Sequence, residues 1–91
     1  MIKTFKHRGL KELFETGDTR RIGRQAQPRA RRQLDTLDQA QKPEAMNVPG
    51  WRFHALQGHK ARYSVTVTAN FRLTFDWEDG DAYRVDYEDY H

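Results

Sequence analysis

The sequence contains no cysteine and no long apolar run among its 91 residues. Without cysteine there is no disulfide scaffold and no cysteine-ligated zinc site, which fits a reducing compartment, so we expect a cytoplasmic protein. The apolar segments are too short to span a bilayer and the N-terminus lacks a signal-peptide core, so we expect no membrane partner. The length predicts a single domain over residues 1–91.

The chain is rich in aromatic residues and in charged residues. Eleven Phe, Tyr and Trp residues predict a compact core rather than disorder. Residues 1–32 hold ten Lys and Arg against three Asp and Glu, whereas residues 76–91 hold one Arg against seven acids. Because arginine binds phosphate in a bidentate fork, the basic half indicates a polyanion partner such as nucleic acid. An ordinary solvated surface is the alternative.

The spacing of apolar residues predicts two helices in the N-terminal half. We expect a short strand over residues 1–5, a helix from about residue 7 to residue 16, and a loop over residues 17–28. The second helix begins near Pro28 and is expected to end at Pro43. Its apolar stripe comprises Ala30, Leu34, Leu37 and Ala40.

In the C-terminal half, apolar and polar residues alternate, which predicts strands. A three-residue loop at 79–81 keeps every apolar side chain on one face, whereas a two-residue turn would mix the faces. The expected pairs are Trp77–Tyr83, Phe75–Val85 and Leu73–Tyr87. This register also places Arg72 opposite Glu88, with Tyr90 diagonal to it. The predicted fold is α/β (α+β), with two N-terminal helices on one face of a small, mostly antiparallel twisted sheet.

The chain ends in Asp89, Tyr90 and His91. A carboxylate, a phenol and an imidazole are side chains that move protons or orient a histidine in enzymes. Each candidate also has a simpler interpretation. A terminal histidine is usually frayed, His54 alone is more often a packing or surface residue, and Arg72 is typical of a solvated pair with Glu88.

Seven segments, taken in order and spacing, resemble one family. They are residues 1–7, 13–17, 34–38, 53–58, 70–75, 80–83 and 87–91. The chain resembles the HigB toxins of the RelE superfamily, small bacterial toxins that cut messenger RNA on the ribosome. The resemblance runs from end to end, and the terminal Asp-Tyr-His is part of what makes it specific.

The resemblance implies a set of catalytic residues. They are His54, Arg72, Asp89, Tyr90 and His91. Some relatives carry a lysine where this chain has Gln57, and Lys60 is a candidate replacement for that cation. His54 and His91 would serve as acid and base, in an order that the sequence leaves open, and Arg72 would bind phosphate. No cofactor is implied, and the histidine spacing does not favour a metal site.

The resemblance also implies partners. The expected antitoxin is a HigA-type helix-turn-helix protein, through which DNA would be contacted only indirectly, and the expected targets are the ribosome and mRNA. Ribosomal RNA contacts are assigned to Lys60 and to the basic half, and the alternative for the arginines is simple solvation. These arginines are Arg20, Arg21, Arg24, Arg29, Arg31 and Arg32. Two alternatives for the whole chain stay open: a non-catalytic RNA- or ribosome-binding module, and a corepressor partner of the antitoxin.

Overall fold

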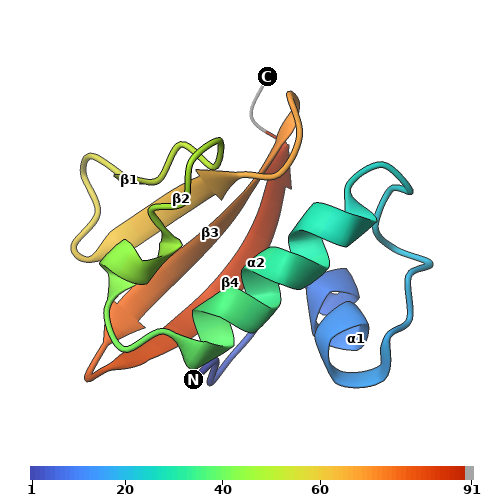
Figure 1. The fold of residues 1–91 in the computed structure, drawn as a ribbon. Coiled ribbons are helices and arrows are strands. Elements are labelled where there is room, and N and C mark those ends of the chain that lie inside the picture. The colour runs from blue at the N-terminus through green and yellow to red at the C-terminus, as the bar shows by residue number, and fades with distance from the viewer. Residues whose placement is uncertain (90–91) are drawn as a thin grey trace.

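The computed structural model describes residues 1–89 and has two layers (Figure 1). Its elements in chain order are α1 (Arg8–Thr16), α2 (Gln27–Gln39), η1 (Pro43–Met46), β1 (His54–Ala55), β2 (Arg62–Thr66), β3 (Phe71–Glu78) and β4 (Asp81–Asp89). The strands follow one another in the sheet in the order β1-β2-β3-β4, and each neighbouring pair is antiparallel. Both helices pack on one face of the sheet, so the predicted fold class is confirmed.

Helix α1 lies within one residue of its predicted bounds. His7 caps its start, because the Nδ1 atom accepts a hydrogen bond from the Leu10 N–H at 3.1 Å. Gly17 ends the helix with a φ of 77°, in the left-handed region that glycine adopts without strain. A Cβ atom on Gly9 would lie 2.7 Å from the Cβ of Arg21, so the chain that follows the helix packs directly against it.

Helix α2 begins as predicted but ends earlier. Pro28 lies in its first turn, and the predicted apolar stripe is buried against the sheet. Helix α2 ends at Gln39, because Ala40 is already extended with a ψ of 139°. The prediction that Pro43 ends this helix was therefore wrong. Pro43 instead opens the 3₁₀ helix η1, where its fixed φ fits the first turn.

The predicted first strand is reduced to two isolated parallel bridges, Ile2 to Ala82 and Phe5 to Val85. Between the bridges, Arg84 of β4 has a φ of 48°, and its N–H donates to the Thr4 hydroxyl at 2.8 Å. A side-chain contact thus replaces a ladder hydrogen bond. The N-terminal segment follows β4 without forming a continuous strand.

The β3–β4 hairpin differs from the predicted register near its turn. Asp79 and Gly80 have φ values of 51° and 83°, as a two-residue type I′ turn requires. The pairs nearest the turn are Glu78–Asp81, Trp77–Ala82 and Asp76–Tyr83, so the predicted three-residue loop and the Trp77–Tyr83 pair were wrong.

A bulge in β4 restores the predicted register farther from the turn. Arg84 and Val85 stand together where β3 has only Phe75, and this extra residue moves the apolar side chains back to one face. Beyond the bulge, the predicted pairing of Leu73 with Tyr87 and of Arg72 with Glu88 is confirmed.

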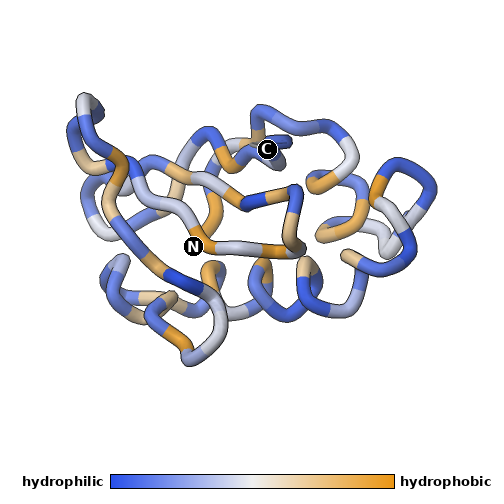
Figure 2. The backbone as a smooth tube through the Cα atoms, turned by 90° about the horizontal axis from the view of Figure 1, so that it is seen from above, coloured by the Kyte–Doolittle hydropathy of each residue, from blue (hydrophilic) through white to orange (hydrophobic). Residues whose placement is uncertain are grey.

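Hydrophobic residues are distributed in short stretches along the whole chain (Figure 2). The core lies between the helices and the sheet, where Leu10 and Leu34 pack with Leu73, Phe75 and Val85 in one buried cluster. Within residues 1–89, no helix combines the length and apolarity that a membrane crossing requires.

Candidate functional site

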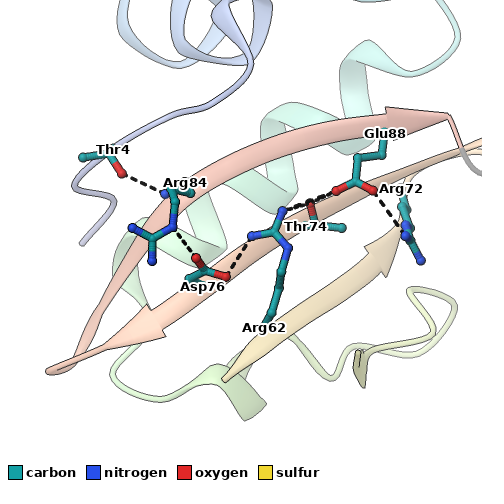
Figure 3. Close-up of polar contacts among 7 residues, drawn as sticks. All are labelled: Thr4, Arg62, Arg72, Thr74, Asp76, Arg84 and Glu88. Atoms are coloured by element: carbon teal, nitrogen blue, oxygen red, sulfur yellow. Dashed lines mark hydrogen bonds and ion pairs between the residues drawn. The ribbon is translucent and has the colours of Figure 1, made fainter. Parts of the chain in front are cut away.

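The sheet face opposite the helices carries charged side chains in alternating order (Figure 3). Because Leu73 and Phe75 point into the core, the residues between and beside them on β3 point to the other face. Ion pairs there connect five residues in a row, which we call the charge chain. In order, they are Arg84, Asp76, Arg62, Glu88 and Arg72.

Arg62 lies at the centre of the charge chain, with only 12% of its side chain exposed. Its guanidinium donates to Asp76 Oδ1 at 2.8 Å, to the Thr74 hydroxyl at 2.7 Å and to Glu88 Oε2 at 3.3 Å. The fully buried Thr74 hydroxyl donates in turn to Glu88 Oε2 at 2.6 Å. Arg62 therefore connects β2, β3 and β4 through polar contacts that cross the sheet.

Glu88 lies between two guanidinium groups. Its Oε2 faces Arg62, and its Oε1 accepts from Arg72 Nη2 at 3.2 Å, which confirms the predicted cross-strand pair. Burial raises the pKa of Glu88, but hydrogen bonds from Thr74, Arg72 and Arg62 outweigh that effect and bring the pKa below its usual value. The carboxylate stays ionised and holds the Arg72 guanidinium on the polar face.

Asp76 is ionised for a similar reason. Burial raises the pKa of Asp76, but hydrogen bonds from Arg62 and Arg84 lower it by more. The net pKa therefore lies below the usual value. The Arg84 Nε–H group contacts Asp76 Oδ2, and 57% of the Arg84 side chain is exposed. This end of the charge chain is therefore open to solvent.

His54 stands on β1, in one cross-strand row with Ser64 of β2 and Thr74 of β3. Its Nδ1 atom lies 3.0 Å from the Arg52 carbonyl oxygen, and since a carbonyl only accepts, Nδ1 carries the proton. In the neutral ring, Nε2 then has the lone pair, and it lies 3.5 Å from the Ser64 hydroxyl. The ring is exposed, so Nε2 is placed to take a proton from a bound molecule.

A cavity of about 340 Å³ is hollowed into this polar face. Its lining residues are Lys6, Leu56, His59, Arg62, Arg72, Asp76, Arg84 and Glu88. Four of these residues are lysine or arginine and two are aspartate or glutamate, so the lining has an excess of positive charge. A concave surface of this composition is suited to an anion such as a phosphate.

Several residues of this cavity were missed by sequence reasoning. The position of Arg62 could have been predicted from the sequence, because the alternation of Tyr63, Val65 and Val67 already places it on the polar face. The position of Lys6 could not have been predicted in this way, because its place beside the cavity depends on the pairing of the N-terminal segment with β4.

The predicted catalytic residues are partly within the described structure. His54 and Arg72 both lie on the polar face, on β1 and β3. Asp89 is exposed at the end of β4, opposite Phe71. The predictions for Tyr90 and His91 lie outside the described residues. Across residues 1–89, no group of three His, Cys, Asp or Glu side chains is arranged to hold a metal ion.

The predicted RNA-binding residues are spread over several surfaces. Lys60 is exposed beside the hairpin end of the charge chain, where it lines a second hollow together with Asp76 and Arg84. Gln57 is exposed in the same β1–β2 connection.

The predicted arginines lie on and around the helices rather than on the polar face. Arg20 pairs with Asp18 at 2.7 Å and Arg21 with Glu12 at 3.1 Å. Arg32 lies over the Trp51 ring at 5.8 Å. All six of the predicted arginines are exposed, namely Arg20, Arg21, Arg24, Arg29, Arg31 and Arg32. The structure does not bring them together with His54 and Arg72.

The polar face of this α+β fold carries an imidazole and several guanidinium groups, which are side chains that can contact a phosphate ester. The model of one protein family, described as the RelE-like toxin of type II toxin–antitoxin system HigB, matches residues 3–91. The chain belongs to this HigB-like toxin family, as the resemblance indicated, and a type II toxin has an antitoxin as its partner.

Two curated relatives carry the same family name. "Endoribonuclease HigB" of Proteus vulgaris is 45% identical over 92 residues, which cover all of both chains. "Toxin HigB-1" of Vibrio cholerae is 34% identical over 85 residues, or 90% of each chain. The similarity thus includes both helices and the whole sheet.

Proposed function

We propose that this toxin is a ribosome-dependent endoribonuclease that cuts mRNA in the ribosomal A site. The observation that carries the proposal is the placement of His54 and Arg72 on one polar face, beside a cavity with excess positive charge. The name of the Proteus vulgaris relative supports the same reaction class. Inhibition of translation and growth arrest follow from loss of intact messages.

In the proposed reaction, RNA supplies its own nucleophile. A base removes the proton of the 2′-OH, the 2′ oxygen attacks phosphorus, and the bond from phosphorus to the 5′ oxygen breaks. An acid protonates the leaving 5′ oxygen, so the products are a 2′,3′-cyclic phosphate and a 5′-OH end. Arg72 stabilises the negative charge of the phosphorane, and no metal or cofactor is needed.

Two histidines share the proton transfers. The tautomer of His54 favours its Nε2 as one of the two proton-transfer atoms, and His91 supplies the other. Asp89 orients a histidine, and Tyr90 stacks on a base or donates a hydrogen bond. Lys60 supplies a cation on the side where Gln57 stands in place of the lysine of some relatives.

The partners follow from the same proposal. Exposed arginines around the helices contact ribosomal RNA, because non-specific binding to a phosphate backbone uses dispersed cations. The antitoxin is a HigA-type helix-turn-helix protein, and the toxin meets DNA only through it. The toxin acts where ribosomes translate, in the cytoplasm.

Mapping of mRNA 5′ ends after induction of the toxin tests the proposal. We expect new ends within codons for the wild type, and none after deletion of His91 or after His54→Ala. The matched control is Lys42→Ala, which removes an exposed side chain just before η1 that lies outside the cavity. A non-catalytic ribosome binder would stop growth without new 5′ ends, and a pure corepressor would leave growth unaffected. Either result would overturn the proposal.

A further inference from the structure

The cavity on the polar face extends well beyond Arg72. Its lining includes the pair Arg72–Glu88 and also the pair Arg84–Asp76, together with Lys6. Asp76, the partner of Arg84, lies four residues along β3 from Arg72, which is about 13 Å at roughly 3.3 Å per residue. The two ion pairs therefore stand at separate positions along the sheet, and we call the part of the cavity at Asp76 and Arg84, which Lys6 also lines, the Lys6–Arg84 end.

The Lys6–Arg84 end is built to receive an anion. Arg84 contacts Asp76 through Nε, and within residues 1–89 its two terminal NH₂ groups make no ion pair. The Arg84 side chain is more than half exposed, and Lys6 is exposed beside it. Asp76 shares its two oxygens between Arg62 and Arg84, and Lys6 adds a third cation, so positive charge exceeds negative charge at this end.

The backbone of two separate segments holds these cations in place. The Lys6 N–H donates to the Val85 carbonyl at 2.9 Å, and the Arg84 N–H donates to the Thr4 hydroxyl at 2.8 Å. The bulge that contains Arg84 thus pairs with the segment that leads to Lys6. Both side chains line the same cavity because of this pairing.

We propose that Lys6 and Arg84 form a second phosphate subsite, which holds a backbone phosphate of the same mRNA whose scissile phosphate lies at Arg72. The inference rests on the proposed function and deepens it, because it gives the substrate a path along the polar face. A cavity lined by cations both at Arg72 and at Arg84 with Lys6 suits an extended single strand, whereas an isolated anion needs only one of these positions.

Cleavage of ribosome-bound mRNA by Lys6→Gln and Arg84→Gln tests the subsite. The matched control is Lys42→Gln, an exposed lysine before η1 that lies outside this cavity. For each subsite variant we expect kcat/KM to fall and the slope of its logarithm against the logarithm of salt concentration to decrease by about 0.7, as for one single-strand phosphate contact. Lys6→Arg should retain most activity, and thermal unfolding checks that each variant folds.

A scan with methylphosphonate linkages, which are uncharged, then identifies the phosphate. At one position away from the scissile bond, the substitution should weaken wild-type cleavage as much as Lys6→Gln does, and it should not weaken Lys6→Gln further. If Lys6→Gln behaves like Lys42→Gln, the subsite does not exist. If the loss in Lys6→Gln is the same for every modified mRNA, the contact is with ribosomal RNA, and the inference is wrong. Failure of the wild type to cleave would instead overturn the proposed function.

Discussion

The two faces of the sheet use neighbouring residues of the same strands in opposite ways. On the helix side, Leu73, Phe75 and Val85 are completely buried in an apolar core. On the other side, Arg62, Asp76 and Glu88 are largely buried as well, but in ion pairs. Burial of an apolar side chain lowers the free energy of the folded chain, whereas burial of ions must first overcome their desolvation.

This difference separates folding from chemistry. Apolar residues of similar volume could replace a buried ion pair at little or no loss of stability. The ion pairs of the charge chain therefore contribute little to the free energy of folding, and in the proposed function they hold Arg72 on the face where His54 lies. We expect substitutions on the helix side to reduce stability, and substitutions on the polar side to reduce cleavage while the chain stays folded.

Phe75→Ala should give the largest effect. Phe75 is fully buried, so the substitution leaves a cavity between the sheet and the helices and should lower the free energy of unfolding by about 3–5 kcal/mol. Urea unfolding monitored by circular dichroism measures the loss. Phe71→Ala, on the same strand but only partly buried, should lose less. Equal losses would show that the core does not lie where the structure has it.

Arg72→Gln should give the converse result. In the proposed reaction Arg72 stabilises the phosphorane, so loss of its guanidinium should lower kcat for ribosome-bound mRNA by roughly 10²–10³-fold. The free energy of unfolding should change by less than about 1 kcal/mol, because Glu88 keeps its contacts with Arg62 and Thr74. Arg72→Lys should recover only part of the rate, since an ammonium cannot form the bidentate fork. Full activity of Arg72→Gln would remove Arg72 from the reaction.

Local sequence patterns predicted much of the fold, whereas contacts between distant residues could not be predicted. Helical spacing and strand alternation are local signals, and they predicted both helices, the main strands and the pairing of Arg72 with Glu88. A three-residue loop and a two-residue turn with a bulge give the same register beyond the bulge, so alternation could not distinguish them. The choice depends on Arg84, whose contact with Thr4 joins residues 80 positions apart.

The site was predictable to the same extent. The family resemblance named His54 and Arg72 as candidates, and their common face follows from the strand registers and β-strand alternation. The role of Arg62 could not be predicted, because its contact with Glu88 spans 26 residues and depends on the registers of two strand pairs at once. Lys6 reaches the cavity only through tertiary pairing. Charged networks across a sheet therefore need the three-dimensional structure.

The smallest expected effect is the contribution of Glu88, on the polar face, to the pH dependence of stability. The pKa of Glu88 is lower in the folded chain than its ordinary 4.5, so its ionisation stabilises the fold above about pH 4.5 and this contribution is lost as the pH falls through the folded value. Glu88→Gln should lower the free energy of unfolding at neutral pH by about 1 kcal/mol or less, and the two curves should converge at low pH. Denaturant unfolding from pH 7 to pH 3 measures this, with the exposed Glu44→Gln as the matched control for loss of one carboxylate. If Glu88→Gln is as stable as the wild type at pH 7, the ion pairs of Glu88 make no net contribution to folding, and the division between the two faces is sharper still.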